Sequence, residues 1–165
     1  MSAMPQLEGP PRGHFVDRDL AAEAVAMALP LLEAAMRHPE YGDSGFLHIV
    51  VMNPAATVAE TRFEDAILYE HSIGDRARWD ADYAAFARAK ARLSWRFQED
   101  SAVVINLRPH ALREDDTLLW GSVWLDGIVV GVSGAFPCFD EAYSGIVAMC
   151  LRALAKRRAG RAATS

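Results

Sequence analysis

The sequence predicts an α+β domain in which helices pack on an antiparallel sheet of about five strands. Apolar residues recur at steps of three and four over residues 78–98, which is typical of an amphipathic helix. Asp126-Gly127 stands between two apolar runs and predicts a tight hairpin. Because hairpin strands pair antiparallel, this mixture of helices and hairpins favours an α+β fold over a parallel α/β fold.

The chain length is that of one domain. Its 165 residues are enough to bury a core. We expect a flexible leader over residues 1–16, a single domain over 17–158 and a flexible basic tail over 159–165. No apolar run approaches the roughly 20 residues that a membrane span needs, and the N-terminus lacks the pattern of a secretory signal. We therefore predict no membrane contact.

Charge and cysteine content argue against two further classes, nucleic-acid-binding proteins and disulfide-stabilised proteins. The formal net charge of −5 argues against non-specific binding of nucleic acid, which needs a basic surface. Cys138 and Cys150 fall on one predicted helix, too far apart to form a disulfide with each other. A reducing, cytoplasmic setting fits this pattern best.

The first half of the chain is predicted to hold a helix and two strands. The helix covers residues 17–37, with Pro30 as a kink or a break. The apolar run 46–52 predicts a strand, and the partly alternating segment 64–73 predicts its hairpin partner.

The second half follows the amphipathic helix with three strands and a last helix. The strands are predicted over residues 101–107, 117–124 and 128–133. The last helix is predicted to start near Pro137, because proline suits the first helical position, and to reach about Arg158.

Both faces of the predicted strand 117–124 are apolar. Trp120 and Trp124 point to one face, and Leu119 and Val123 point to the other. One layer of helices cannot cover both faces. Helices on each face, a partner subunit or a bound ligand would each bury the two tryptophans.

Three segments carry a resemblance to a known family. Asp126, Gly127 and the run through Val132, Ser133, Gly134, Pro137, Asp140 and Glu141 match a motif of the form D-G-x-V-x-G-A-x-G-V-S-G-G-x-P-x-x-D-E, with the strand after the turn two residues shorter. Ala89, Lys90 and Ala91 match a K-A-x-x-A segment, and Arg96-Phe97 follows it. These segments resemble the GlcG/HbpS-like family, which includes the C-terminal domain of PduO-type proteins, and its heme-degrading-domain-like branch.

The resemblance implies a profilin-like fold, homo-oligomers and a bound small ligand. Several members of that family bind heme or related tetrapyrroles, so heme is the cofactor that the resemblance implies. We therefore expect a small-ligand-binding module for a tetrapyrrole or another small acidic ligand. An enzyme acting on that ligand, such as one that degrades heme, and a non-catalytic accessory subunit are the alternatives.

Two histidines on the first two predicted strands are candidate iron ligands. His48 and His71 each have apolar neighbours, and imidazole on an apolar wall is what a heme iron uses. If the two strands pair, the side chains could approach each other, although the pattern does not determine the register. The alternative for each is a core histidine whose nitrogens meet other protein groups.

Cations on the amphipathic helix are candidates for holding an acidic ligand. Arg88, Arg92 and Arg96 form a stripe that could clamp carboxylates, but we favour a solvated outer face. Lys90 interrupts the apolar stripe of the same helix. It either extends to the surface or neutralises a buried anion.

The loop before the last helix is the remaining candidate. Backbone amides after Ser133-Gly134 could hold an anion at the helix start. Cys138 lies in the first turn, a position that could make its thiol a nucleophile, but packing is the role we favour. No catalytic residue can be assigned from the pattern.

Overall fold

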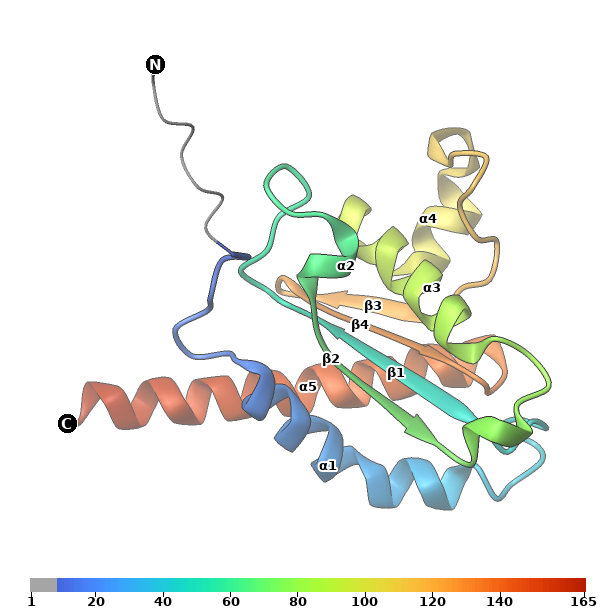
Figure 1. Ribbon diagram of the computed structural model, residues 1–165, viewed down its shortest axis with the longest axis horizontal. Coiled ribbons are helices and arrows are strands. Elements are labelled where there is room, and N and C mark those ends of the chain that lie inside the picture. The colour runs from blue at the N-terminus through green and yellow to red at the C-terminus, as the bar shows by residue number, and fades with distance from the viewer. Residues whose placement is uncertain (1–8) are drawn as a thin grey trace.

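The computed structural model describes residues 9–165 as an antiparallel sheet between helices (Figure 1). The elements follow in the order α1 (Arg18–Ala35), β1 (Leu47–Met52), α2 (Phe63–Ala66), β2 (Ile67–Ile73), η1 (Arg76–Arg78), α3 (Tyr83–Phe97), α4 (Ser101–Leu107), η2 (Pro109–Ala111), β3 (Ser122–Leu125), β4 (Ile128–Ser133) and α5 (Pro137–Ala163). The α+β class is confirmed. The sheet of the described residues has four strands rather than about five, in the order β2-β1-β4-β3.

The sheet is covered by helices on both faces. Leu47, Ile49 and Val51 of β1 join the core formed with α1 and α5. Val50 and Met52, which alternate with them, join the core under α3. Every residue of β1 is therefore buried, and its sequence is apolar except for His48. Figure 1 shows α1 and α5 on one side of the sheet and α3 on the other.

The hairpin prediction at Asp126-Gly127 is confirmed. Both residues have positive φ, 50° and 89°, as the central residues of a type I′ hairpin turn require. Val123 pairs with Val130 across the hairpin, and β4 in turn pairs antiparallel with β1.

The predicted strand over 101–107 is wrong: this segment forms helix α4. Its Val and Ile residues favour a strand, but that preference is weak and tertiary contacts override it. Asp100 and Ser101 at the start of α4 accept hydrogen bonds from the outer edge of β3. The helix start thus covers the edge on which a fifth strand would have paired.

Two other predicted strands are shorter than expected. The strand expected over 117–124 begins only at Ser122, because Gly121 before it has a φ of 144°. A Cβ at that glycine would lie 2.6 Å from the Cβ of Asp140. The strand expected over 64–73 begins at Ile67, after the short helix α2.

The helices differ from prediction mainly at their ends. Pro30 lies inside α1, which continues through it to Ala35. The helix expected from residue 78 starts instead at Tyr83, where the carboxylate of Asp82 accepts a hydrogen bond from the amide of Ala85. The last helix runs past Arg158 to Ala163, into the segment expected to be a flexible tail, and extends beyond the sheet (Figure 1).

The leader expected over residues 1–16 is described in part. Residues 1–8 lie outside the described residues. Beyond them, the side-chain amide of Asn53 donates to the carbonyl of Pro11 at 2.7 Å, which ties the segment before α1 to the end of β1.

Candidate functional site

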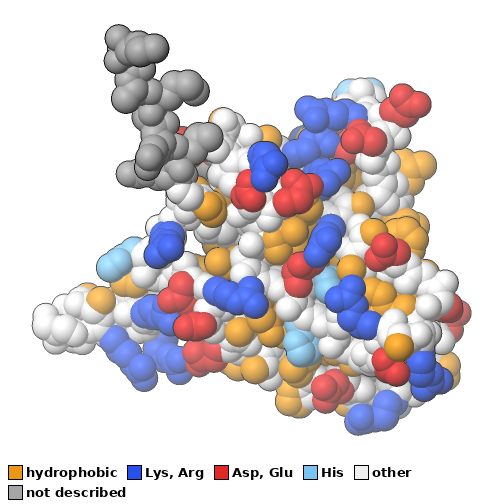
Figure 2. All heavy atoms as spheres, viewed as in Figure 1, with side chains coloured by type: hydrophobic (Ala, Val, Ile, Leu, Met, Phe, Trp, Pro, Cys, Tyr) orange, Lys and Arg blue, Asp and Glu red, His pale blue; other side chains and the backbone are white. Residues whose placement is uncertain are grey.

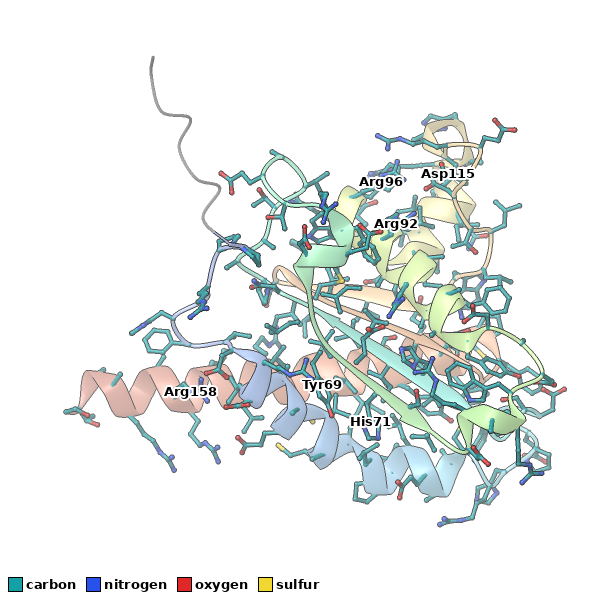
Figure 3. The ribbon with its side chains drawn as sticks, in the orientation of Figure 1. Tyr69, His71, Arg92, Arg96, Asp115 and Arg158 are labelled. Atoms are coloured by element: carbon teal, nitrogen blue, oxygen red, sulfur yellow. The ribbon has the colours of Figure 1, made fainter. Side chains whose placement is uncertain are left out.

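His48 and His71 lie on opposite faces of the sheet, which settles the question that the sequence pattern left open: they do not approach each other. The register pairs His48 with Ser72 and Ile49 with His71. Because side chains alternate along a strand, His48 faces α3 and His71 faces α1. Figure 3 shows His71 beside Tyr69 on β2, and their rings stack with centroids 6.4 Å apart.

His48 is a buried histidine with both ring nitrogens in contact with protein groups. Its Nδ1 lies 2.8 Å from Ser72 Oγ and its Nε2 lies 3.1 Å from Glu70 Oε1. His48 is only 3% exposed, and its ring packs edge-on against the Trp79 ring. Burial lowers the pKa of His48, although Glu70 opposes this shift. With no nitrogen left for iron, His48 does not fit the role of a heme ligand.

Glu70 connects this histidine to α3. Arg88 donates from Nε and Nη2 to the two carboxylate oxygens of Glu70, each at 2.7 Å. Burial pushes the pKa of Glu70 up, but the hydrogen bonds from Arg88 and His48 outweigh it and the pKa is lowered.

The side chains of Ser72, His48 and Glu70 have the order hydroxyl, imidazole, carboxylate that nucleophilic hydrolases use. However, the Glu70 carboxylate already forms an ion pair with Arg88. Neither Ser72 nor His48 lines either of the two cavities described below. We assign the network to joining β1, β2 and α3.

The solvated outer face that we favoured for the arginine stripe of α3 holds for Arg88 and Arg92, whose side chains are 48% and 38% exposed, but not for Arg96 at 12%. Each arginine forms an ion pair with a different segment: Arg88 with Glu70, Arg92 with Glu64 at 3.5 Å, and Arg96 with Asp116. Arg92 also lies over the Phe63 ring, 4.7 Å from its centroid. Figure 3 labels Arg92 and Arg96 on this helix. These contacts fix α2, β2 and the loop after α4 against α3.

Lys90 is buried and pairs with a carboxylate of its own chain. Its ammonium donates to Asp140 Oδ2 at 2.8 Å, to the Val132 carbonyl at 3.1 Å and to Ser133 Oγ at 3.3 Å. Lys90 is 2% exposed and Asp140 is 1% exposed. Burial raises the pKa of Asp140 to about 6, against the opposing charge of Lys90. Of the two alternatives for Lys90, neutralisation of a buried anion is confirmed, and the anion is Asp140.

The helix start after Ser133-Gly134 is occupied by the same carboxylate. Asp140 Oδ1 accepts from the amide of Ala135 at 2.9 Å. A Cβ at Gly134, whose φ is 133°, would lie 2.0 Å from the Phe46 carbonyl oxygen. The loop is therefore packed against protein on the side where we expected an external anion. Cys138 in the following turn is exposed and forms no disulfide.

Trp124 is half-buried beside the core under α3, and Trp120 precedes β3 rather than lying in a strand. Helices on each side of the sheet cover Trp124, whereas Trp120 lies outside the sheet and Leu118 and Leu119 beside it remain exposed. Neither tryptophan lines either described cavity.

Two adjoining cavities lie along the outer edge of β2. One, of about 330 Å³, is lined by Glu64, the run from Ile67 to Glu70, Arg18 and Arg88. The other, of about 900 Å³, lies between β2 and the segment before α1 and is lined in part by Pro10, Pro11 and Val16. Arg18, Ile67 and Leu68 belong to both cavities, so they mark where the two meet.

Arg18 is a candidate site residue that sequence reasoning missed. Its Nη1 donates to the Leu68 carbonyl at 3.2 Å, and its guanidinium lies over the Tyr69 ring, 5.2 Å from the centroid. It forms no ion pair with a carboxylate of residues 9–165. Its position directly after the helix cap Asp17 does not distinguish it, in sequence, from any surface arginine.

The surface around this site is mixed in charge. Figure 2 shows basic and acidic side chains interspersed over the face that carries β2 and α3, with apolar atoms between them. Residues 9–165 bring together no group of three or more His, Cys, Asp or Glu side chains that could hold a metal ion. Among the same residues, no helix has the length and apolar character needed to cross a membrane.

Comparison with known proteins does not assign the chain to a family. No family model matches it, and no curated protein matches it.

Proposed function

We propose that this chain is a small-ligand-binding module of the GlcG/HbpS-like, profilin-like type, and that its ligand is an organic acid held at Arg18. The observation that carries the proposal is the position of Arg18 between two cavities with no carboxylate partner in residues 9–165. A guanidinium with unused donors favours a carboxylate, because a charge-assisted pair is among the strongest of hydrogen bonds.

The two cavities differ in a way that favours an acid with an apolar body. The larger cavity has Pro10, Pro11, Val16 and Ile67 among its apolar walls, and its charged lining residues are Arg12, Asp17, Arg18 and Asp65. Ligand sites typically measure about 300–1,000 Å³ and combine apolar walls with a few polar groups. An apolar body in this space would place its carboxylate near Arg18.

A tetrapyrrole falls within this class, because it has carboxylates on an apolar ring. In this proposal it is held through a carboxylate at Arg18 and not through iron bound to His48. His71 does not line either cavity and is given no role. Heme would then bind without a protein histidine on its iron, and its absorption would be insensitive to substitution of either histidine.

Titration of the wild type with heme and with a panel of aromatic and aliphatic carboxylic acids tests the proposal. We expect saturable binding of at least one acid that is lost in Arg18→Ala and kept in Arg37→Ala. Arg37 is an exposed arginine outside both cavities and serves as the matched control. Equal binding by wild type and Arg18→Ala would overturn the site. If the change in heme absorption on binding were lost in His71→Ala alone, iron ligation would again be the explanation.

The proposal includes a homo-oligomer in a reducing, cytoplasmic setting. Cys138 and Cys150 are both free thiols, which supports the setting. Leu118 and Leu119 are 71% and 45% exposed, and they supply apolar surface for subunit contact.

A further inference from the structure

The two edge strands of the sheet, β3 and β2, differ in what contacts their outer backbone groups. On β3, the amide of Trp124 donates to Asp100 Oδ1 at 2.9 Å and the amide of Ser122 donates to Ser101 Oγ at 3.0 Å. These side chains at the start of α4 satisfy the outer backbone groups of that edge. β2 forms the opposite edge, and no strand of the described residues lies outside it. An edge strand of this kind is a template for pairing with another chain.

The backbone groups that β2 presents outward can be assigned from the register. The amide of Asn53, just after β1, donates to the Ala66 carbonyl at 2.7 Å. Because backbone groups alternate in direction along a strand, the backbone N–H and C=O groups of the odd-numbered residues of β1 point toward β2. Ile49 is opposite His71 and Val51 is opposite Tyr69. Because backbone groups alternate along an antiparallel strand, those of Glu70 and Ser72 point away from the sheet.

A bulge changes this pattern at the start of the strand. The register shifts between Val51 and Met52, so that Leu68 is an extra residue on β2. Its carbonyl faces outward, where Arg18 donates to it. Pairing with another strand is therefore available at Glu70 and Ser72 and ends at Arg18.

The smaller cavity lies along this edge. Four consecutive residues of β2, from Ile67 to Glu70, form one of its walls. A cavity walled by a run of consecutive strand residues suits an extended chain, because main-chain hydrogen bonds then supply the affinity.

We propose that the ligand at Arg18 is the C-terminal segment of an extended peptide that adds to β2 as an antiparallel strand. This inference rests on the proposed function, since it uses the same carboxylate contact. Arg18 lies at the start of β2, so a peptide whose terminal carboxylate reaches Arg18 runs from Ser72 toward Leu68. That direction is antiparallel to β2, as are all the pairs of this sheet.

Charge disfavours a second copy of this chain that pairs on the same edge about Glu70. A two-fold axis at Glu70 would place that residue opposite its own copy, and like charges directly opposite each other destabilise a strand pair. A peptide with a basic or uncharged residue at that position avoids this repulsion. The bidentate contact of Arg88 keeps the Glu70 carboxylate ionised and in place.

The test uses a short fluorescein-labelled peptide of alternating Val and Thr, with Lys opposite Glu70, and fluorescence anisotropy of the full chain. We expect the free-acid peptide to bind at least about tenfold more tightly than its C-terminal amide, as loss of a hydrogen bond to a charged group implies. In Arg18→Ala the two forms should bind equally, and Arg37→Ala should behave as wild type.

The hydrogen bonds of the added strand are tested on the peptide, so that the protein stays unchanged. Methylation of the peptide amide that pairs with the Glu70 carbonyl should weaken binding at least about tenfold, whereas methylation of the next amide, which faces solvent, should not. Equal binding of all methylated forms would overturn strand addition, and equal binding of acid and amide forms by wild type would overturn the orientation.

The small carboxylic acids separate this inference from the proposed function. If they bind in an Arg18-dependent way and no peptide binds, the peptide inference is wrong and the acid site stands. If neither binds, both are wrong.

Discussion

Two titratable side chains, His48 and Lys90, are buried on the α3 side of the sheet and stabilised in different ways. His48 stays neutral, because burial lowers its pKa, and it meets a hydroxyl and a carboxylate. Lys90 meets a carboxylate, a hydroxyl and a carbonyl. Both therefore satisfy the rule that buried polar groups need partners. The shifted pKa values of His48 and of Asp140, the partner of Lys90, make the stability of the fold depend on pH.

Lys90→Met tests the buried ion pair. The substitution leaves Asp140 without its cation, and breaking a buried pair in this way costs about 3–5 kcal/mol of unfolding free energy at neutral pH. The raised pKa of Asp140, about 6, means that ionisation of this group removes stability as the pH rises from about 3.8 through about 6. Loss of Lys90 raises that pKa further, so the variant should recover part of its stability at mildly acidic pH.

Urea denaturation at neutral and at mildly acidic pH measures this effect. The matched control is Lys90→Met combined with Asp140→Asn, which removes both charges and should be less destabilised at neutral pH than the single variant. A loss of the same size at both pH values would count against the ion pair as its cause.

His48→Gln tests the second buried group. A lowered pKa in the folded chain means that the unfolded chain takes up a proton first, below about 6.5. Stability is therefore present above about pH 6.5 and is lost as the pH falls. Wild type should lose up to about 2 kcal/mol more than His48→Gln between pH 7 and 5, at about 1.4 kcal/mol per pH unit below 6.5. Parallel pH profiles in chemical denaturation would contradict this.

At the scale of elements, α4 is the piece whose role is least evident from its composition. Ser101 and the cap residue Asp100 hold the outer edge of β3 through their side chains. The edge is thus closed without a fifth strand. On the opposite edge, the start of α1 contacts the outward Leu68 carbonyl through Arg18, and the remaining part of β2 is the side that we propose for binding.

Ser101→Ala tests the role of α4. Ser101 Oγ accepts from the amides of Gly121 and Ser122, each at 3.0 Å. Removing it leaves buried donors unpaired, which should cost about 1–3 kcal/mol of unfolding free energy and speed hydrogen exchange at Ser122. Val103→Ala on the exposed side of the same helix is the control and should change stability by about 0.5 kcal/mol or less. Unchanged exchange at Ser122 in Ser101→Ala would refute the capping role.

At the scale of the whole molecule, two cores share one sheet. The core with α1 and α5 uses one set of β1 side chains, and the core under α3 uses the alternate set. Two ion pairs join α5 to the α1 region on the outside of the layer that these two helices form. Arg157 pairs with Glu23, and Arg158 pairs with Asp17. Such exposed pairs contribute little, so burial of both faces of the sheet accounts for most of the stability.

The proposed homo-oligomer is tested at this scale. Leu118→Asp combined with Leu119→Asp places charge on the apolar surface before β3 and should shift the protein to a smaller species in sedimentation velocity. Because both side chains are exposed, the monomer should keep its unfolding free energy to within about 0.5 kcal/mol. Wild type that sediments as a monomer at high concentration would end the oligomer proposal.

The sequence alone determined the features that depend on neighbouring residues. Asp126-Gly127 adopts positive φ at both positions and joins β3 to β4, as its composition predicts. The strand around His48, the amphipathic helix of Lys90 and the last helix from Pro137 were likewise predicted, because periodicity and proline act over a few residues.

Only the tertiary structure decided the features that depend on residues far apart in the chain. Val and Ile in 101–107 favour a strand, but contacts with β3 make the segment a helix. Lys90 finds its partner 50 positions away, at Asp140. Arg18 becomes a candidate site residue only because Leu68 and Tyr69 lie beside it, 50 or more positions along the chain. No local pattern encodes such contacts, since they arise when the sheet register and the packing of α1 against β2 are set.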